Sequence, residues 1–212
     1  MEHEAALLRD RLALSDAQRV RLGRLAETMN AMGALSLQLN TLDAERIKDL
    51  CVGRVPSLVG ARNAALFAVD SATGELLLER HSDASLRSLS CRLGPGEDSL
   101  LDRAISSQEI LVVNDIAVFR EGLGEVFRAC PALAGIRRAC LVAPLRVSQA
   151  LVGVLVLMDR EDEAAFDAVN DLPCVQQVTQ LIGTALRNLQ LYELVVAQAR
   201  VDPLTGVFNR RA

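Results

Sequence analysis

Residues 139–160 read ACLVAPLRVSQALVGVLVLMDR, and this stretch decides the fold of the chain. It holds two apolar runs of strand length, 139–146 and 151–160, joined by a tight turn near Ser148 and Gln149. Both runs are apolar at nearly every position, which is typical of strands that are covered on both faces. We therefore expect a hairpin at the centre of a sheet.

Further strands are predicted upstream of this hairpin. The runs 64–69 and 75–81 flank the turn Ser71–Gly74 and predict a second hairpin. Residues 87–93 and 109–113 predict two more strands, and 98–106 predicts a short helix between them. The pattern from 115 to 138 is the least periodic part of the chain.

Helices are expected at both ends. Residues 4–40 favour a helix, with a restart at Ser15 because Ser15 and Gln18 fit a capping box. A second helix is expected from Asp43 to about Val59, capped by Asn40 or Thr41. Pro56 should kink or shorten this second helix, and Gly60 should end it.

A long helix is expected from Glu163 to Arg200, with a break near Asp171 ahead of Pro173. Mostly antiparallel strands between terminal helices predict the α+β class: a central antiparallel sheet flanked by helices. Long helices should form both ends of the chain.

Composition excludes several classes of function. The net charge of −4 argues against nucleic acid, which is usually met by a basic face. The longest apolar run, 150–158, is too short for a membrane helix, and the N-terminus does not resemble a secretory signal. We therefore expect a cytoplasmic protein that contacts neither nucleic acid nor membrane.

The cysteines and histidines predict no metal site. Two histidines and five cysteines without any C-x-x-C spacing do not supply the paired ligands that zinc needs. Reduced, buried thiols are the favoured interpretation of Cys51, Cys91, Cys130, Cys140 and Cys174.

Four segments carry a resemblance to GAF domains, the small-molecule sensors of bacterial signalling: LGPGEDSL at 93–100, VVND at 112–115, LVAPL at 141–145 and LVGVL at 151–155. The last two resemble the hairpin typical of that family. The resemblance covers about residues 41–192 and implies a pocket between the sheet and the 115–138 loop. Candidate pocket residues are Phe67, Phe119, Phe127, Arg138 and Cys140. The ligand is unknown, and Arg137 with Arg138 could either meet an anion or remain a solvated pair.

The final residues, VDPLTGVFNRRA at 201–212, closely resemble the opening of a GGDEF domain, the catalytic unit of diguanylate cyclases. The resemblance implies that Asp202, Leu204, Thr205, Asn209 and Arg210 form a hinge to a cyclase domain lying beyond Ala212. The catalytic loop and metal-binding aspartate of such a domain are not in these 212 residues, so this chain should make no cyclic di-GMP. GTP and Mg²⁺ are expected only for the cyclase domain, and no catalytic or metal residue is expected here.

A heptad seam links the two resemblances. It consists of Val175, Val178, Ile182, Ala185, Leu189, Tyr192, Val196 and Ala199. The favoured interpretation is a parallel homodimer that passes a signal through this helix, and the alternative is a helix lying on its own sheet. The predicted division is a helical segment at 1–40, a GAF domain at 41–174, a signalling helix at 175–200 and the start of a GGDEF domain at 201–212.

Three functions stay open: a ligand-binding regulatory module, a module used only for dimerisation, and a cysteine-based reductase of free methionine sulfoxide. The reductase would use Cys91, Cys130 and Cys140, but the residues around them do not match that family's pattern.

Overall fold

The computed structural model describes residues 2–70, 72–86, 91–93, 100–119, 130–148 and 150–200. The chain divides into two compact units, 1–37 and 38–212. Within the described residues, no helix combines the length and apolar character that crossing a membrane requires.

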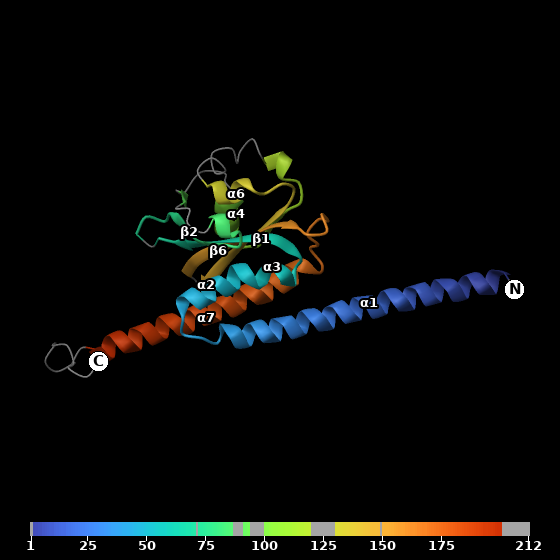
Figure 1. The fold of residues 1–212 in the computed structure, drawn as a ribbon, viewed down its shortest axis with the longest axis horizontal. Helices are drawn as coiled ribbons and strands as arrows, with labels where there is room; N and C mark the ends of the chain where they lie inside the picture. Colours follow the sequence, from blue (N-terminus) through green and yellow to red (C-terminus); the bar gives the residue numbers. More distant parts are fainter. Residues whose placement is uncertain are drawn as a thin grey trace. The chain divides into compact units, whose positions relative to one another are not determined.

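The second unit is built on an antiparallel sheet whose strand order differs from the order in the chain (Figure 1). Its described strands are β1 (Ala61–Val69), β2 (Leu76–His81), β3 (Arg92–Leu93), β4 (Leu111–Val113), β5 (Cys140–Val147) and β6 (Ala150–Arg160). They lie in the order β3-β2-β1-β6-β5-β4. The predicted α+β class with a central antiparallel sheet is confirmed, and so is the central hairpin of β5 and β6.

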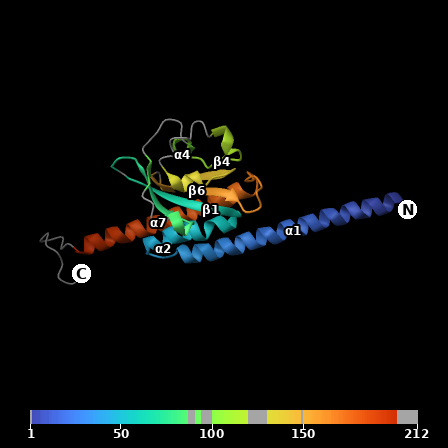
Figure 2. The same cartoon turned by 45° about the horizontal axis from the view of Figure 1, so that its top comes forward.

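Helices cover both faces of the sheet (Figures 1 and 2). On one face lie α2 (Ala44–Gly53), α3 (Val55–Leu58) and α7 (Asp171–Arg200), which contact β1 and β5. On the other lie α4 (Leu100–Ser107) and α6 (Pro131–Ala134). The 3₁₀ turn η2 (Ile116–Phe119) comes between these two helices in the sequence. A short 3₁₀ turn, η1 (Ala84–Leu86), follows β2. Because successive strand residues point to opposite faces, the continuous apolar runs of β5 and β6 fill both layers.

The first unit lies within one helix, α1, which runs from Glu2 to Leu39. The restart predicted at Ser15 is wrong, because the helix passes through that residue without interruption. Leu22 and Met29 of this helix are exposed.

The second predicted helix is split at Arg54 into α2 and α3, with Pro56 at the start of α3, where its missing N–H costs nothing. Its cap is Asp43, and the cap predicted at Asn40 or Thr41 is wrong. The Asp43 carboxylate accepts the N–H groups of Glu45 and Arg46 at 3.0 and 3.2 Å. Gly60 ends the segment with a φ of 63°, as predicted.

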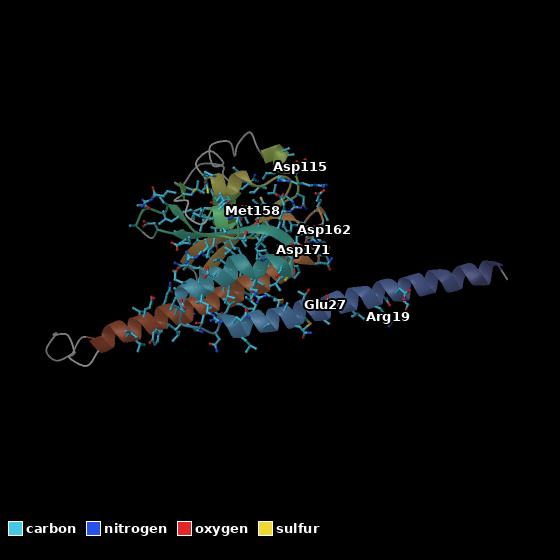
Figure 3. The ribbon with its side chains drawn as sticks, in the orientation of Figure 1. Arg19, Glu27, Asp115, Met158, Asp162 and Asp171 are labelled. Atoms are coloured by element: carbon cyan, nitrogen blue, oxygen red, sulfur yellow. The ribbon has the colours of Figure 1, made fainter. Side chains whose placement is uncertain are left out.

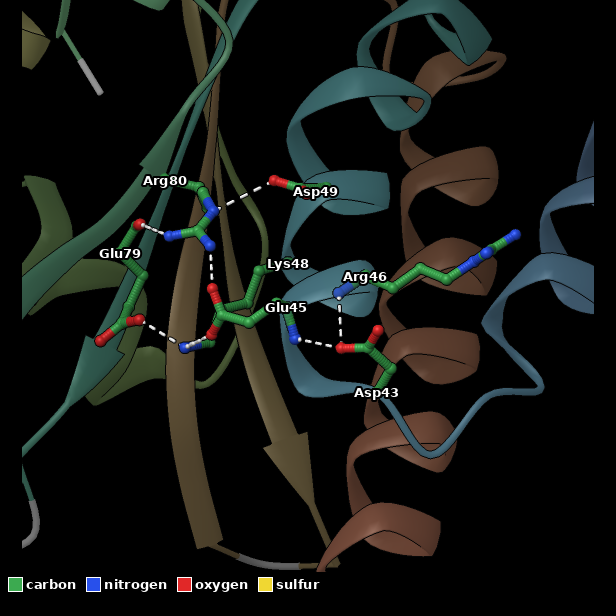
Figure 4. Close-up of polar contacts among 7 residues, drawn as sticks. All are labelled: Asp43, Glu45, Arg46, Lys48, Asp49, Glu79 and Arg80. Atoms are coloured by element: carbon green, nitrogen blue, oxygen red, sulfur yellow. Dashed lines mark hydrogen bonds and ion pairs between the residues drawn. The ribbon is translucent and has the colours of Figure 1, made fainter. Parts of the chain in front are cut away.

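An ion-pair network joins α2 to β2 across the layers (Figure 4). The Lys48 ammonium contacts Glu45 at 2.9 Å and Glu79 at 2.6 Å. The Arg80 guanidinium contacts Asp49 at 3.1 Å and also pairs with Glu45. These pairs are partly exposed, so each contributes only modestly to stability.

The predicted helix 163–200 starts later, at Asp171, and residues 161–170 form two turns joined by irregular backbone instead. A long-range contact explains the difference. Asn114 accepts the Phe166 N–H at 2.8 Å and donates to the Phe166 carbonyl at 3.0 Å, which holds the Phe166 side chain in the interior. Pro173 is tolerated because it falls in the first turn of α7.

Candidate functional site

The face of the sheet beneath α4 and α6 is filled by an apolar cluster. Phe67 and Cys140, two of the predicted pocket residues, are both completely buried in it. Met158, labelled in Figure 3, belongs to the same cluster. The described residues that complete it come from every strand and from the covering turns: Ala65, Leu76, Cys91, Leu93, Leu100, Leu101, Ala104, Val113, Ile116, Cys130, Ala132, Leu133, Ile136, Val142, Val154 and Val156.

The other predicted pocket residues do not join Phe67 and Cys140. Arg138 is exposed and lies in a different cavity, described below. Phe119 ends η2, but its side chain lies outside the described part of the structure, as does Phe127 entirely. For the side chains that are described, Phe67 and Cys140 are core residues and Arg138 is a surface residue.

The five cysteines are all described, and all are buried thiols. Burial raises the pKa of Cys51 and of Cys140 to about 12, and it also raises the pKa of Cys91, which hydrogen-bonds to Cys130. A nucleophilic cysteine needs the opposite shift, because the thiolate is the reactive form. These thiols therefore have the character of core side chains.

His81 is buried at the end of β2. Its Nδ1 accepts the Asp83 N–H at 2.9 Å, which fixes the neutral tautomer with the proton on Nε2. Burial lowers the pKa of His81, with polar groups of Asp83 and Ala132 acting against that shift. His81 is thus a neutral core residue at physiological pH.

A cavity of about 210 Å³ opens where the start of β1, the start of β5 and the end of β6 meet. Four of its lining side chains are arginines: Arg62, Arg137, Arg138 and Arg160. Ala139, Asp159, Glu163 and Ala164 complete the lining. This set is called the arginine pocket from here on.

The first wall of the arginine pocket is held by Asp159, which has a φ of 47°. Its carboxylate accepts the backbone N–H groups of Arg137, Arg138 and Ala139 at 2.9, 2.8 and 3.0 Å. Three donors satisfy this buried carboxylate, so the 137–139 segment is fixed against the end of β6.

The second wall is held by Arg160. Its guanidinium contacts both carboxylate oxygens of Asp162, at 2.9 and 3.0 Å, and Asp171 at 2.6 Å. This pairing lowers the pKa of Asp162 to about 2, mainly through the hydrogen bond from Arg160. Asp162 and Asp171 lie at the same end of the unit in Figure 3, and Asp171 is the first residue of α7.

A wider surface groove of about 620 Å³ runs between α7 and the edge of the sheet. Pro144 lies in it, on the part of β5 that extends past the last β4 partner, Val142. Proline is suited to such an open edge because it has no N–H to leave unpaired. The remaining lining is mostly polar: Gln108, Glu109, Ile110, Arg146, Leu172, Gln176, Thr179 and Gln180.

The first part of the predicted seam is covered by its own chain. Val175, Val178 and Ile182 are fully buried, and Ala185 and Leu189 nearly so, because α7 packs along β5. Gly183 permits this approach: a Cβ there would lie 2.4 Å from the Arg146 carbonyl oxygen. Residues 175–189 of the seam are therefore covered by their own sheet, as the alternative interpretation expects, and the homodimer stays a prediction.

The second part of α7 is uncovered. Leu191, Tyr192, Leu194 and Val195 are 51%, 48%, 59% and 62% exposed, and Val196 is partly buried. The side chain of Ala199 lies outside the described residues, as do the predicted hinge residues Asp202, Leu204, Thr205, Asn209 and Arg210. The sheet ends where Arg187 donates to the Ser148 hydroxyl at 2.9 Å, and α7 continues past that point.

The sheet order and the helices on both faces define the class of protein. The family model of the GAF domain matches residues 43–186, and the chain belongs to this family. GAF domains are regulatory modules of signalling proteins. No curated protein sequence matches the chain significantly.

Solved structures share the fold. Residues 122–287 of a methyl-accepting chemotaxis protein superpose with a TM-score of 0.64 at 13% identity, covering 74% of this chain and 98% of that one. The GAF domain of a sensor histidine kinase from Bacillus halodurans gives 0.54 at 18%, covering 72% and 99%. The free methionine-R-sulfoxide reductase of Neisseria meningitidis, solved with its substrate, gives 0.60 at 15%, covering 79% and 92%.

Sequence reasoning missed two members of the arginine pocket, Arg62 and Arg160. Neither lies in a motif, and they are 98 positions apart in the printed sequence. Strand register unites them, because Ala61 pairs with Arg160 across β1 and β6. A prediction that the start of β1 pairs antiparallel with the end of β6 would have placed Arg62 near Arg160.

Proposed function

We propose that this GAF domain is the regulatory part of a diguanylate cyclase and controls it through α7. The terminal motif from Asp202 to Arg211 supports the cyclase assignment. The helix supports the route of control, since α7 is continuous from the sheet to Arg200, two residues before the motif. In this proposal a cyclase domain beyond Ala212 condenses two molecules of GTP, with Mg²⁺, into cyclic di-GMP.

The observation that carries the proposal is a change of character on one side of α7. Opposite the stripe buried on β5, the helix presents polar residues as far as Asn188, among them Gln177, Thr184 and Arg187. From Leu191 that same side becomes apolar, with Leu194 and Val195 one turn on. The side of α7 that faces away from β5 is polar while the helix packs on the sheet and becomes apolar beyond the sheet. Exposed apolar residues on a helix favour a partner that covers them.

We infer that the partner is the same segment of a second copy. Two α7 helices in parallel would bury Leu191, Leu194 and Val195 against each other and deliver two cyclase domains side by side, as a reaction between two GTP molecules requires. A ligand-driven change in the sheet layer would reach this contact through the packed part of α7, provided that two arrangements of the pair lie within a few kcal/mol.

Two experiments test the proposal. The coding sequence beyond Ala212 should encode the Gly-Gly-Asp/Glu-Glu-Phe loop, and the complete protein should convert GTP into cyclic di-GMP; a different downstream domain would overturn the assignment. Sedimentation should show a dimer that Leu194→Glu dissociates. Gln177→Glu, on the same side of the supported part, is the matched control and should leave the dimer intact.

A module used only for dimerisation is the remaining candidate, and the filled apolar cluster favours it over a large buried ligand. A thermal-shift screen with nucleotides and metabolites separates the two functions. A ligand that binds only the folded state raises the melting temperature, whereas a purely dimerising module responds to protein concentration alone.

A further inference from the structure

The arginine pocket has no part in the proposed control of a cyclase, and its composition is unusual for a chain whose net charge is −4. Four arginines, Asp159 and Glu163 are among the residues that line its volume of about 210 Å³. Asp162 and Asp171 pair with one of the four arginines, Arg160. The like charges that need compensation are therefore those of the other three arginines.

Two of the four arginines are already engaged. Arg160 forms ion pairs with Asp162 and Asp171, and Arg138 donates to the Glu163 carbonyl at 2.8 Å. These contacts build the walls. They also mean that neither Arg160 nor Arg138 can leave the pocket without breaking a hydrogen bond that fixes a loop.

The other two arginines are available. Arg62 and Arg137 are exposed, and no carboxylate of the described residues forms an ion pair with either guanidinium. Arg62 comes from the start of β1 and Arg137 from the segment before β5, so they reach the cavity from different directions. The Asp159 carboxylate cannot serve them fully, because it already accepts three backbone N–H groups.

The backbone around the cavity is held in uncommon conformations. Asp159 and Glu163, with φ of 47° and 58°, are two of the four described non-glycine residues with positive φ, and both line the pocket. Residues other than glycine rarely adopt such angles, and clusters of them are found at ligand sites. Here both angles are maintained by the contacts that form the walls.

We propose that the arginine pocket binds a phosphate group, either free or as part of a small metabolite. A phosphate presents acceptor oxygens in several directions and so can serve Arg62, Arg137 and Arg138 together, which a planar carboxylate with two oxygens cannot. The volume is below that of pockets for drug-sized ligands, so the ligand is small. Bound phosphate would join the start of β1 to the 137–138 segment, next to the Arg160–Asp171 pair at the start of α7.

Inorganic phosphate is the probe for the test, titrated against chloride at constant ionic strength. Backbone amide NMR signals of Ala139, Glu163 and Ala164 should shift in a saturable manner. The variant Arg62→Gln/Arg137→Gln should weaken the fitted affinity about tenfold or more, because each lost hydrogen bond to a charged group is worth about that factor. The variant Arg46→Gln/Arg54→Gln removes two exposed arginines elsewhere and should leave the affinity unchanged.

Three outcomes would overturn the proposal. The first is a response without saturation, and the second is an equal response in the pocket variant and the control variant, since either would indicate general salt effects. The third is saturable binding of succinate in place of phosphate. Both altered arginines are exposed, so the variants should fold, and circular dichroism of each variant checks that they do.

Discussion

The two halves of α7 have similar apolar content and opposite surroundings. From Val175 to Leu189 its apolar stripe lies on β5 and is buried within a single chain. From Leu191 to Val195 its apolar side chains are about half or more exposed. The difference teaches that a regular heptad pattern predicts an apolar stripe on a helix but does not predict what buries that stripe. In α7 one continuous pattern is first buried against β5 and then exposed beyond the end of the sheet.

The largest expected effect comes from deleting a side chain in the covered half. Ile182→Ala should lower the free energy of unfolding by about 2–5 kcal/mol, because it leaves a cavity between helix and sheet. Leu194→Ala, in the uncovered half, should change it by less than about 0.5 kcal/mol at low protein concentration. Urea unfolding followed by circular dichroism measures both, and equal effects would erase the distinction between the halves.

The closeness of α7 to β5 is tested at Gly183. Gly183→Ala should destabilise the protein by about 1–3 kcal/mol, because the new Cβ would lie 2.4 Å from the Arg146 carbonyl oxygen. Gly33→Ala is the control, since a Cβ at that position in α1 would meet nothing within 4 Å beyond the adjoining backbone of its own helix. Alanine is the better helix former, so the control should be neutral or stabilising by up to about 1 kcal/mol. A stabilising Gly183→Ala would mean that the covered half is looser than the structure indicates.

Alkaline pH tests how well the buried interior excludes water at Cys51 and Cys140. Cys51 and Cys140 have pKa values raised to about 12 in the folded protein, mainly by burial, so the unfolded chain loses these protons first as the pH rises. Stability should therefore be complete below about pH 8.5 and should fall above it by about 1.4 kcal/mol per pH unit per thiol.

The chain has one lysine and one tyrosine, and burial also raises the pKa of Cys91 and Cys174, so the double variant should lose part of the slope and not all of it. The slope of unfolding free energy against pH from 9 to 11 should become shallower in Cys51→Ala/Cys140→Ala. Cys174→Ala is a weaker control at the start of α7. An unchanged slope in the double variant would show that these thiols ionise freely in the folded state.

The smallest effect is expected from the ion pairs between α2 and β2. Lys48→Met removes contacts to Glu45 and Glu79, and the three side chains are 26%, 59% and 28% exposed. The loss should be about 0.2–1 kcal/mol and should shrink in 1 M salt. Thermal unfolding at low and high salt measures it. A larger, salt-independent loss would place these polar contacts on a par with the packing beneath α7.

The elements of this fold were largely predictable, and their ends were not. The β5–β6 hairpin was predictable because two continuous apolar runs around a short turn have few other solutions. The start of α7 was not, because residues 163–170 have an acceptable helical pattern that is overridden by hydrogen bonds between Phe166 and Asn114, 52 positions apart.

The candidate site was less accessible to sequence reasoning. Phe67, Cys140 and Arg138 were expected around one pocket, yet positions 138 and 140 face different environments because β5 begins at Cys140 and Arg138 precedes it. Cys140 enters the apolar cluster, and Arg138 turns to the surface with Arg62 and Arg160. The alternation of strand faces was predictable, but the residue at which the strand begins was not.

By itself the sequence determined that this chain builds a central antiparallel sheet between terminal helices, because the spacing of apolar residues selects strand or helix locally. Only the tertiary structure decided at which residue α7 stops packing on the sheet, since that depends on the length of β5 and on the register in which the helix crosses it. It also decided that Arg62, Arg137, Arg138 and Arg160 share one cavity, because pairing of strand ends brings together residues that no local pattern connects.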